Sequence, residues 1–292
     1  MAIKTQIAFE GLTYNLDDRD RVAMKGATQD TKDGAHFKYS ESTYGPSDLI
    51  VGAGGSDDNN VKPFSETSTQ LFPFGAKLIY GEKIFRYAGI AGASVTAGKC
   101  VQVAAATANH RDKKVDANTS DGATSVGVRL GATAAAANLY KDGYLHILSG
   151  SQGGQLLKIK SHDAVASAGT GSFSTYDTVS GSLEGEINHA DLMINPYNDL
   201  VVAPTSFTGP VVGVTPRGFT ADYYGWVQTG GPCSVLLSGT VVLGQQAVRS
   251  DTLAGAVEPL DADAEGESTV VGQVMVVNDT TEYGVVWLNL DS

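Results

Sequence analysis

The chain has 292 residues, 35 of them glycine, and few of the long aliphatic and charged residues that build amphipathic helices, so its composition favours β-structure over helix bundles. Its formal net charge of −12 repels nucleic-acid phosphates and anionic lipid headgroups, which argues against DNA, RNA or a membrane surface as a partner. The sequence has neither the apolar core of a secretory signal nor a window of about 18 uninterrupted apolar residues. We therefore expect a protein that is made and assembled in a cytoplasm.

Residues 1–75 differ in composition from the rest of the chain, because they are dense in Asp, Asn, Ser, Thr and Gly and show no sustained hydrophobic period. Ordering such a segment costs on the order of 1 kcal/mol per residue in backbone entropy, and it has little apolar surface of its own to offset that cost. Two alternatives follow: a loosely packed leader, or an extended arm that lies along a neighbouring subunit. The arm would make its contacts through isolated aromatic residues, namely Phe9, Tyr14, Phe37, Tyr39, Tyr44, Phe64, Phe72 and Phe74.

Regular β signals begin at Lys77. Residues 77–80 and 83–87 flank a Gly81-Glu82 turn and predict a hairpin, and a strand is expected at 98–104. Residues 107–123 are polar and charged, which is typical of a surface loop.

A second group of signals completes a first domain at 76–170. It consists of a strand at 125–130, an Ala-rich run at 132–140, and a hairpin of 144–148 with 155–160 across the Gly150–Gly154 turn. The Ala-rich run is the one helical candidate, and a packed crossover is its alternative.

Residues 171–200 alternate weakly and supply edge strands or a bridge to a second domain at 171–292. Strands of four to eight residues, separated by Gly and Pro, are expected there at 199–203, 211–215, 223–229, 234–237, 240–243, 269–277 and 283–290. This spacing predicts an all-β protein built from small antiparallel β-barrel or β-sandwich units.

Three similar pairs of phrases recur in the chain and predict a repeated β-hairpin. In each pair a Val-Gly phrase is followed by a Gly-containing aromatic phrase: 126–128 with 142–147, 211–214 with 224–228, and 270–274 with 283–287. We expect Gly225 and Gly284 to form bulges that turn Trp226 and Val285 inward, so the aromatics of these phrases are core residues first.

The sequence holds no convincing catalytic equipment. Its histidines, including the pairs His162-Asp163 and His189-x-Asp191, lack the spacing of a metal or acid–base site, and Gly150–Gly154 leads into a strand rather than a phosphate-binding helix. The acidic groups at 57–60 and 261–265 offer oxygen ligands but do not match a calcium loop, so we read them as solvated turns. Cys100 and Cys233 are expected to be buried free thiols. We predict no catalytic residue, no cofactor and no metal ligand.

Four phrases, in chain order, resemble the capsid decoration (cement) proteins of tailed bacteriophages: Phe85–Ala88, Val95–Lys99, Tyr140–Leu145 and Tyr224–Gly231. The resemblance covers residues 75–292, and the first 75 residues match no motif. It implies a small β-barrel or β-tulip-like domain on the outside of the virion head that bridges capsomers, with the major capsid protein and copies of itself, commonly in trimers, as partners. It carries over no catalytic residue.

Three other classes of function compete with this interpretation. A carbohydrate or host-surface binding module, such as a head fibre or tail-associated domain, would stack sugar rings on Trp226 or Trp287. A polysaccharide-degrading enzyme would need two paired carboxylates in a cleft. A major shell-forming subunit usually has a long helix, and the sequence offers no strong candidate for one.

Overall fold

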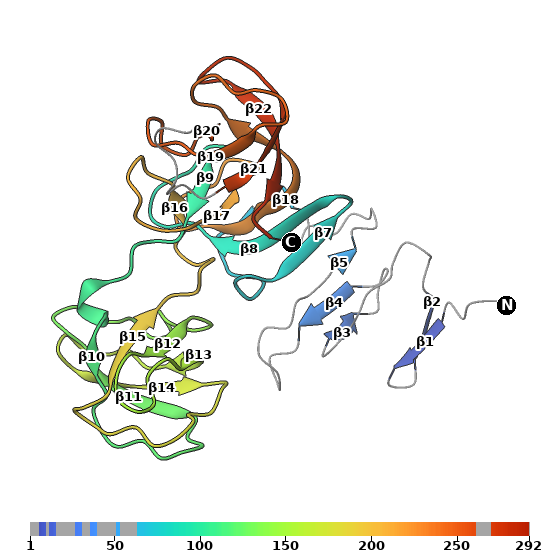
Figure 1. Ribbon diagram of the computed structural model, residues 1–292. Helices are drawn as coiled ribbons and strands as arrows, with labels where there is room; N and C mark the ends of the chain where they lie inside the picture. Colours follow the sequence, from blue (N-terminus) through green and yellow to red (C-terminus); the bar gives the residue numbers. More distant parts are fainter. Residues whose placement is uncertain are drawn as a thin grey trace. The chain divides into compact units, whose positions relative to one another are not determined.

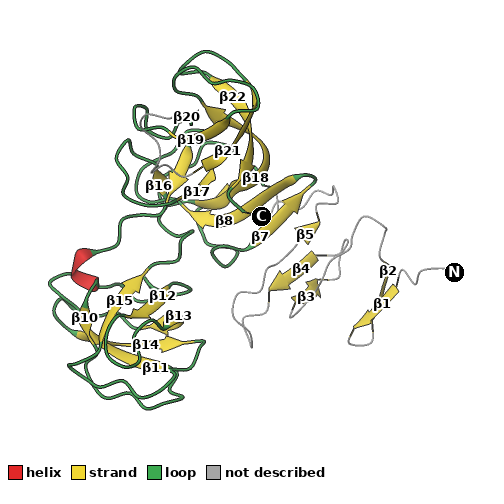
Figure 2. Ribbon diagram, in the orientation of Figure 1, coloured by secondary structure: helices red, strands yellow, loops and turns green. Residues whose placement is uncertain are grey.

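The computed structural model describes residues 63–260 and 270–291 in full, and the backbone of five short strands before them. The protein is nearly all β (Figure 2), as the composition predicts. Within these residues the one helical element is a 3-10 turn, η1 (Ala108–His110). It falls within 107–123, so the segment predicted to be a loop contains a short regular element. The Ala-rich run at 132–140 is not a helix but a series of bends and turns that is mostly exposed, in which Ala135 is buried and forms an isolated bridge with Val165.

The chain divides into two compact units that are not consecutive in sequence (Figure 1). Unit 1 consists of Met1–Phe72, Ala76–Gln102 and Asp199–Ser292, and unit 2 of Pro73–Gly75 and Val103–Asn198. This differs from the expected boundaries at 75/76 and 170/171. Residues 76–102 belong with the C-terminal third, because β8 (Lys83–Gly89) and β9 (Cys100–Gln102) pair with strands that follow residue 200.

Unit 2 is a single curled antiparallel sheet of six strands in the order β10-β15-β12-β13-β14-β11. The two edge strands meet where Val115 bridges Val128, so the sheet closes on itself in the manner of a small barrel. The predicted hairpin at 144–160 is confirmed by the pairing of β12 with β13. The strands are β10 (Lys113–Lys114), β11 (Ser125–Arg129), β12 (Tyr144–Ile147), β13 (Leu156–His162), β14 (Thr170–Thr175) and β15 (His189–Met193).

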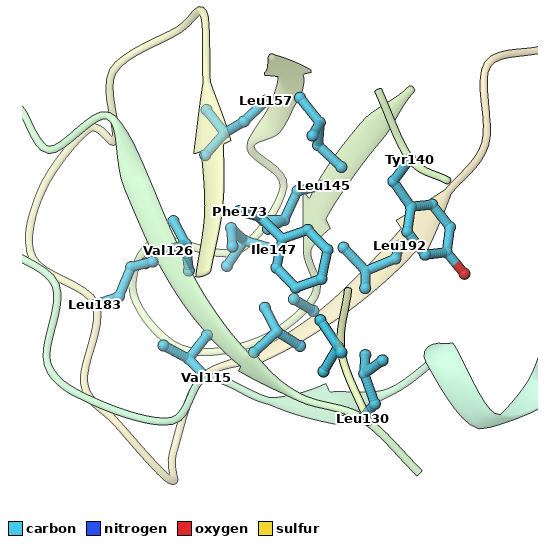
Figure 3. Packing of buried hydrophobic residues seen from close by; sticks show 14 of the residues in the cluster. Val115, Val126, Leu130, Tyr140, Leu145, Ile147, Leu157, Phe173, Leu183 and Leu192 are labelled. Carbon is cyan, nitrogen blue, oxygen red and sulfur yellow. The ribbon is translucent and has the colours of Figure 1, made fainter. Parts of the chain in front are cut away.

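The core of unit 2 follows from strand alternation, because every second residue of β11, β12 and β15 points inward. Figure 3 shows aliphatic side chains from these strands around the ring of Phe173, with Tyr140 at one end of the cluster. Leu145, Ile147 and Phe173 are fully buried.

Unit 1 is built on a twelve-stranded sheet whose main path runs β16-β9-β17-β18-β22-β21-β19-β20. Its far end curls back, because Leu237, just after β18, bridges Val257 of β20. The predicted hairpin at 77–87 is confirmed, with Tyr80 paired to Lys83 across a two-residue turn. Besides β8 and β9, its strands are β6 (Glu66–Thr67), β7 (Lys77–Tyr80), β16 (Val201–Val202), β17 (Val211–Val214), β18 (Tyr224–Leu236), β19 (Gln246–Arg249), β20 (Val257–Pro259), β21 (Val270–Val276) and β22 (Tyr283–Asn289).

The strands before residue 53 form two separate antiparallel pairs and supply the twelfth strand of the unit 1 sheet. The pairs are antiparallel between β1 (Gln6–Phe9) and β2 (Leu12–Asn15), and between β3 (Ala27–Asp30) and β4 (His36–Tyr39), while β5 (Val51–Gly52) pairs in parallel with β7.

Strand β18 is 13 residues long and serves two sets of neighbours. Its first half, from Tyr224 to Gln228, pairs with β8, and its second half, from Gly230 to Leu236, pairs with β22. The change of partner occurs at Gly230-Gly231, where Gly231 has a φ of +75° and a Cβ would lie 2.2 Å from the Glu82 carbonyl oxygen. Only glycine allows both this backbone conformation and this close approach.

The three similar phrase pairs share a turn rather than a hairpin. The pairing of β21 with β22 confirms the last hairpin, and β17 meets β18 at one residue pair, but β11 pairs with β14 and not with β12. What recurs is a residue with positive φ two positions before a strand begins, a geometry that Gly, Asp and Asn adopt most easily. These residues are Gly75, Gly81, Gly98, Asp142, Gly154, Ala168, Asp199, Asp222, Gly244, Gly255 and Thr281.

The bend in β18 gives a direct stability test. Gly81→Ala places a side chain at positive φ in open space and should lower the free energy of unfolding by about 1 kcal/mol. Gly231→Ala adds a collision with backbone and should cost at least about 3 kcal/mol. Chemical denaturation of both variants measures the difference. Equal losses would show that the bend does not depend on Gly231.

Candidate functional site

The eight aromatic residues expected on an arm fall into two groups. Tyr44 lies outside the described residues, and for Phe9, Tyr14, Phe37 and Tyr39 the structure describes the strand backbone but not the side chain. Their role as contact residues therefore stays a prediction. Phe64, Phe72 and Phe74 are described in full.

Phe74 is buried and Phe72 is partly buried against a core cluster, which differs from the expected external contact. The Phe72 ring lies 5.2 Å from the Tyr87 ring and 5.4 Å from the Trp226 ring, and Phe74 is buried. The Leu71 N–H donates a hydrogen bond to the Tyr87 hydroxyl over 3.0 Å. Strand β6 also pairs with β18, so residues 63–74 form part of the fold rather than a coreless arm.

The two tryptophans have opposite environments. Trp226 is 1% exposed and forms a core cluster with Leu78, Phe85 and Tyr87, as its position after a glycine predicts. Trp287 is 45% exposed and lies on the outer side of β22. A stacking role is therefore open to Trp287 alone of the two.

Trp287 belongs to an exposed apolar face on β21 and β22. Tyr283, Val285 and Trp287 alternate along β22 and so share one side of the sheet, and Val276 of β21 lies opposite Val285. Val285, predicted to point inward, is in fact half-buried on this outer side. The β21–β22 face, as we define it, consists of Met275, Val276, Tyr283, Val285 and Trp287.

A hollow of about 280 Å³ lies in unit 1 beside this face, and Tyr283 belongs to both. Its floor comes from β18, through Gln228, Cys233 and Ser234 on either side of the bend. The remaining lining residues are Phe64, Lys83, Ala97, Gly98 and Pro216. Because both halves of β18 contribute, the hollow exists only while the strand is bent.

Gln228 is the most constrained polar residue of the hollow. It is 1% exposed, and its Nε2 donates hydrogen bonds to the carbonyl oxygens of Gly230 and Pro232, each over 2.9 Å. These two bonds tie the side chain to the bend and use both amide hydrogens. The sequence patterns described above do not single out Gln228 or Lys83. A signal for the bend beside them is the Gly-Gly-Pro step within a long β run, which indicates a sharply bent strand.

The buried histidines of unit 2, His110 and His162, are hydrogen-bonded within the protein. The Tyr140 N–H donates to His162 Nε2 over 3.0 Å, and His162 Nδ1 donates to the Asp163 carbonyl over 2.7 Å. Burial lowers the pKa of His162, against a smaller opposite effect of Asp163. His110 bonds to the Tyr140 hydroxyl and to the Thr133 carbonyl, and burial raises the pKa of Tyr140 to about 12. These hydrogen bonds fix the two imidazole rings and Tyr140 within unit 2.

The more exposed histidines pair with carboxylates on the surface of unit 2. His189 Nδ1 lies 2.5 Å from Asp112 Oδ1, and His146 Nδ1 lies 3.9 Å from Asp191 Oδ2. The hydrogen bond from His189 lowers the pKa of Asp112. Beside the first pair, the Ser149 hydroxyl accepts a hydrogen bond from the His189 backbone N–H over 2.9 Å.

Neither the thiols nor the acidic groups form a described metal site. Cys100 and Cys233 are buried and free, as expected, and burial raises the pKa of each thiol to about 12, so they are protonated at neutral pH. Across residues 63–260 and 270–291, no three His, Cys, Asp or Glu side chains gather as metal ligands. The acidic groups at 57–60 and 261–265 lie outside the described residues.

Comparison with known proteins gives no match to a family model, to a curated protein or to a solved structure. In the described part of the chain, no helix has the length and apolar character needed to cross a membrane.

The pKa of His162 predicts a pH dependence of stability. Because the folded state binds the proton less tightly than the unfolded state, stability is present above the unfolded pKa of about 6.5 and falls as the pH drops below it. Denaturation at pH 7.5 and pH 5.5 should show a smaller loss for His162→Gln than for the wild type. His189→Gln, at the surface, is the control. A wild-type slope in His162→Gln would contradict the assignment.

Proposed function

We propose that this protein is a structural, non-catalytic protein of a bacteriophage virion. It binds the outer surface of the head, bridges neighbouring major capsid protein subunits and stabilises the shell. Its partners are the major capsid protein and further copies of itself, in a homotrimer, and it uses neither nucleic acid nor a membrane. The resemblance of four phrases between residues 85 and 231 to capsid decoration proteins supports this proposal.

The observation that carries the proposal is the β21–β22 face. Exposed apolar side chains that occur singly are normal, but neighbouring ones on two paired strands are typical of an interaction surface. Trp287 and Met275 are each 45% exposed, and aromatic and Met side chains are enriched in protein–protein interfaces. Burying these side chains against a partner would contribute favourable binding free energy. Because many copies bind around one shell, modest contacts at each copy can add up to strong attachment.

The rest of the protein supports an attachment role through rigidity. Two curled sheets with separate cores present fixed surfaces, so little conformational entropy is lost on binding. An acidic body also disfavours contact with the DNA inside a head.

A carbohydrate-binding module is the second candidate, and one observation favours it. An exposed tryptophan can stack on the apolar face of a sugar ring, and Trp287 is available for this. Trp226 is not, because it lies in the core. In addition, Trp287 is not among the residues that line the hollow. The exposed face thus offers a platform, whereas a typical small-ligand site is concave.

Binding to heads tests the proposal. Purified full-length protein should co-sediment saturably with phage heads that lack it, and Trp287→Thr should weaken this binding at least about tenfold, a typical effect for a central aromatic contact. Thr is chosen because it suits a strand. Leu156→Thr, at an exposed position on a strand of unit 2, is the matched control and should bind normally. Unchanged binding by Trp287→Thr would remove the face from the interface.

The N-terminal aromatics are tested in the same assay with a chain that starts at residue 63. A chain that starts at 76 would also lose Phe72, which packs on Trp226, and so would confuse folding with binding. We expect weaker binding without residues 1–62, because the predicted contacts of Phe9, Tyr14, Phe37, Tyr39 and Tyr44 are removed. If full-length chain does not bind heads but does bind a glycan array, the carbohydrate alternative replaces this proposal.

A further inference from the structure

The hollow in unit 1 has two aromatic walls that are held in place before any ligand binds. Phe64 packs edge-on against the buried Phe85, with ring centres 6.1 Å apart, and Arg217 donates a hydrogen bond to the Phe64 carbonyl over 2.8 Å. Tyr283 also lines the hollow, and its ring lies against Gly98, where a Cβ would come within 2.5 Å of a ring carbon. Fixed aromatic walls suit a flat or aliphatic group placed between them.

A positive charge without a carboxylate partner lies at the hollow. Among the described residues no Asp or Glu forms an ion pair with the Lys83 ammonium, whereas Lys77 pairs with Asp291 and Lys114 with Glu186. Lys83 and Cys233 both line the hollow, so this charge belongs to its surface. In a chain with a net charge of −12, an unpaired cation in a concave site favours an anionic group as ligand.

The floor offers an acceptor. Both amide hydrogens of Gln228 are bound to backbone carbonyls, and its Oε1 accepts no hydrogen bond from any described residue, although the side chain is 1% exposed and lines the hollow. Because no described residue donates to this oxygen, it can accept a hydrogen bond from a ligand that brings an N–H or O–H. The hydroxyl of Ser234 lies exposed at the same floor and can serve either role.

From these groups we infer that the hollow binds one residue of a partner protein that carries a carboxylate, an apolar side chain and a backbone N–H. The carboxylate pairs with Lys83, the apolar group lies between Phe64 and Tyr283, and the N–H donates to Gln228 Oε1. The choice of a protein as the partner rests on the proposed function. It is supported by Tyr283, which joins the hollow to the apolar β21–β22 face, so a single partner surface can cover both.

The test uses the full-length protein and small probes observed by NMR. N-acetyl-phenylalanine has all three groups, and it should shift the amide signals of Ser234 and Tyr283 saturably, with a dissociation constant on the order of 1 mM for a ligand of its size. N-acetyl-phenylalaninamide, which lacks the carboxylate, should bind at least about threefold more weakly. Glucuronate, a sugar with a carboxylate, tests the carbohydrate alternative.

Variants identify the cation. Lys83→Gln should weaken N-acetyl-phenylalanine binding at least about threefold and remove its advantage over the amide. Lys160→Gln, which removes an exposed charge from unit 2, should leave binding unchanged. Equal affinities for acid and amide, no saturable shift at the hollow, or tighter binding of glucuronate would each overturn the inference.

The outcome is independent of the capsid assay, because no phage head is present. Binding of the probe by a protein that does not bind heads would keep the hollow and reject the proposed function. A protein that binds heads but not the probe would keep the proposed function and reject the binding site at the hollow.

Discussion

The structure of unit 1 depends on a single strand that has to satisfy two sets of neighbours. Strand β18 donates and accepts backbone hydrogen bonds with β8 along its first half and with β22 along its second. A straight strand could not follow both partners, and the change of direction is possible because Gly231 adopts a positive φ against the Glu82 carbonyl. Gln228 then holds the bend from inside by two hydrogen bonds to backbone carbonyls. The fold of unit 1, the hollow and the apolar β21–β22 face all depend on this bend.

Surface chemistry follows from the same constraint. Pairing with the second half of β18 orients β22 so that Tyr283, Val285 and Trp287 face outward, while Val286 and Leu288 enter the core. The bend also brings Gln228 close to Cys233 and Ser234, which creates a concave floor where a flat sheet would have none. A rigid face with a small polar hollow beside it is suited to holding another protein. Burial lowers the pKa of His162 and raises the pKa of the Cys100 thiol, and both groups are suited to stabilising a core.

The sequence predicts what is local and fails where pairing is distant. The all-β class and the hairpins at 77–87, 144–160 and 270–289 are confirmed, because turn residues and alternation act within a few positions. The domain boundaries differ, since no local signal reveals that β8 pairs with a strand about 140 residues later. Phe72 looked like part of a coreless arm for the same reason, as its partner Trp226 is equally distant. The sequence does not predict a shared role for Lys83 and Gln228, because they meet only where the bend brings them to one hollow.

Hydrogen–deuterium exchange of the protein, free and bound to phage heads, tests most directly whether the face and hollow of unit 1 hold a partner. If they do, amide exchange on binding should become slower on β21 and β22, at the turn before Tyr283 and around Lys83, with little change on the strands of unit 2. Protection confined to unit 2, or no difference between free protein and protein mixed with heads, would contradict this role of unit 1.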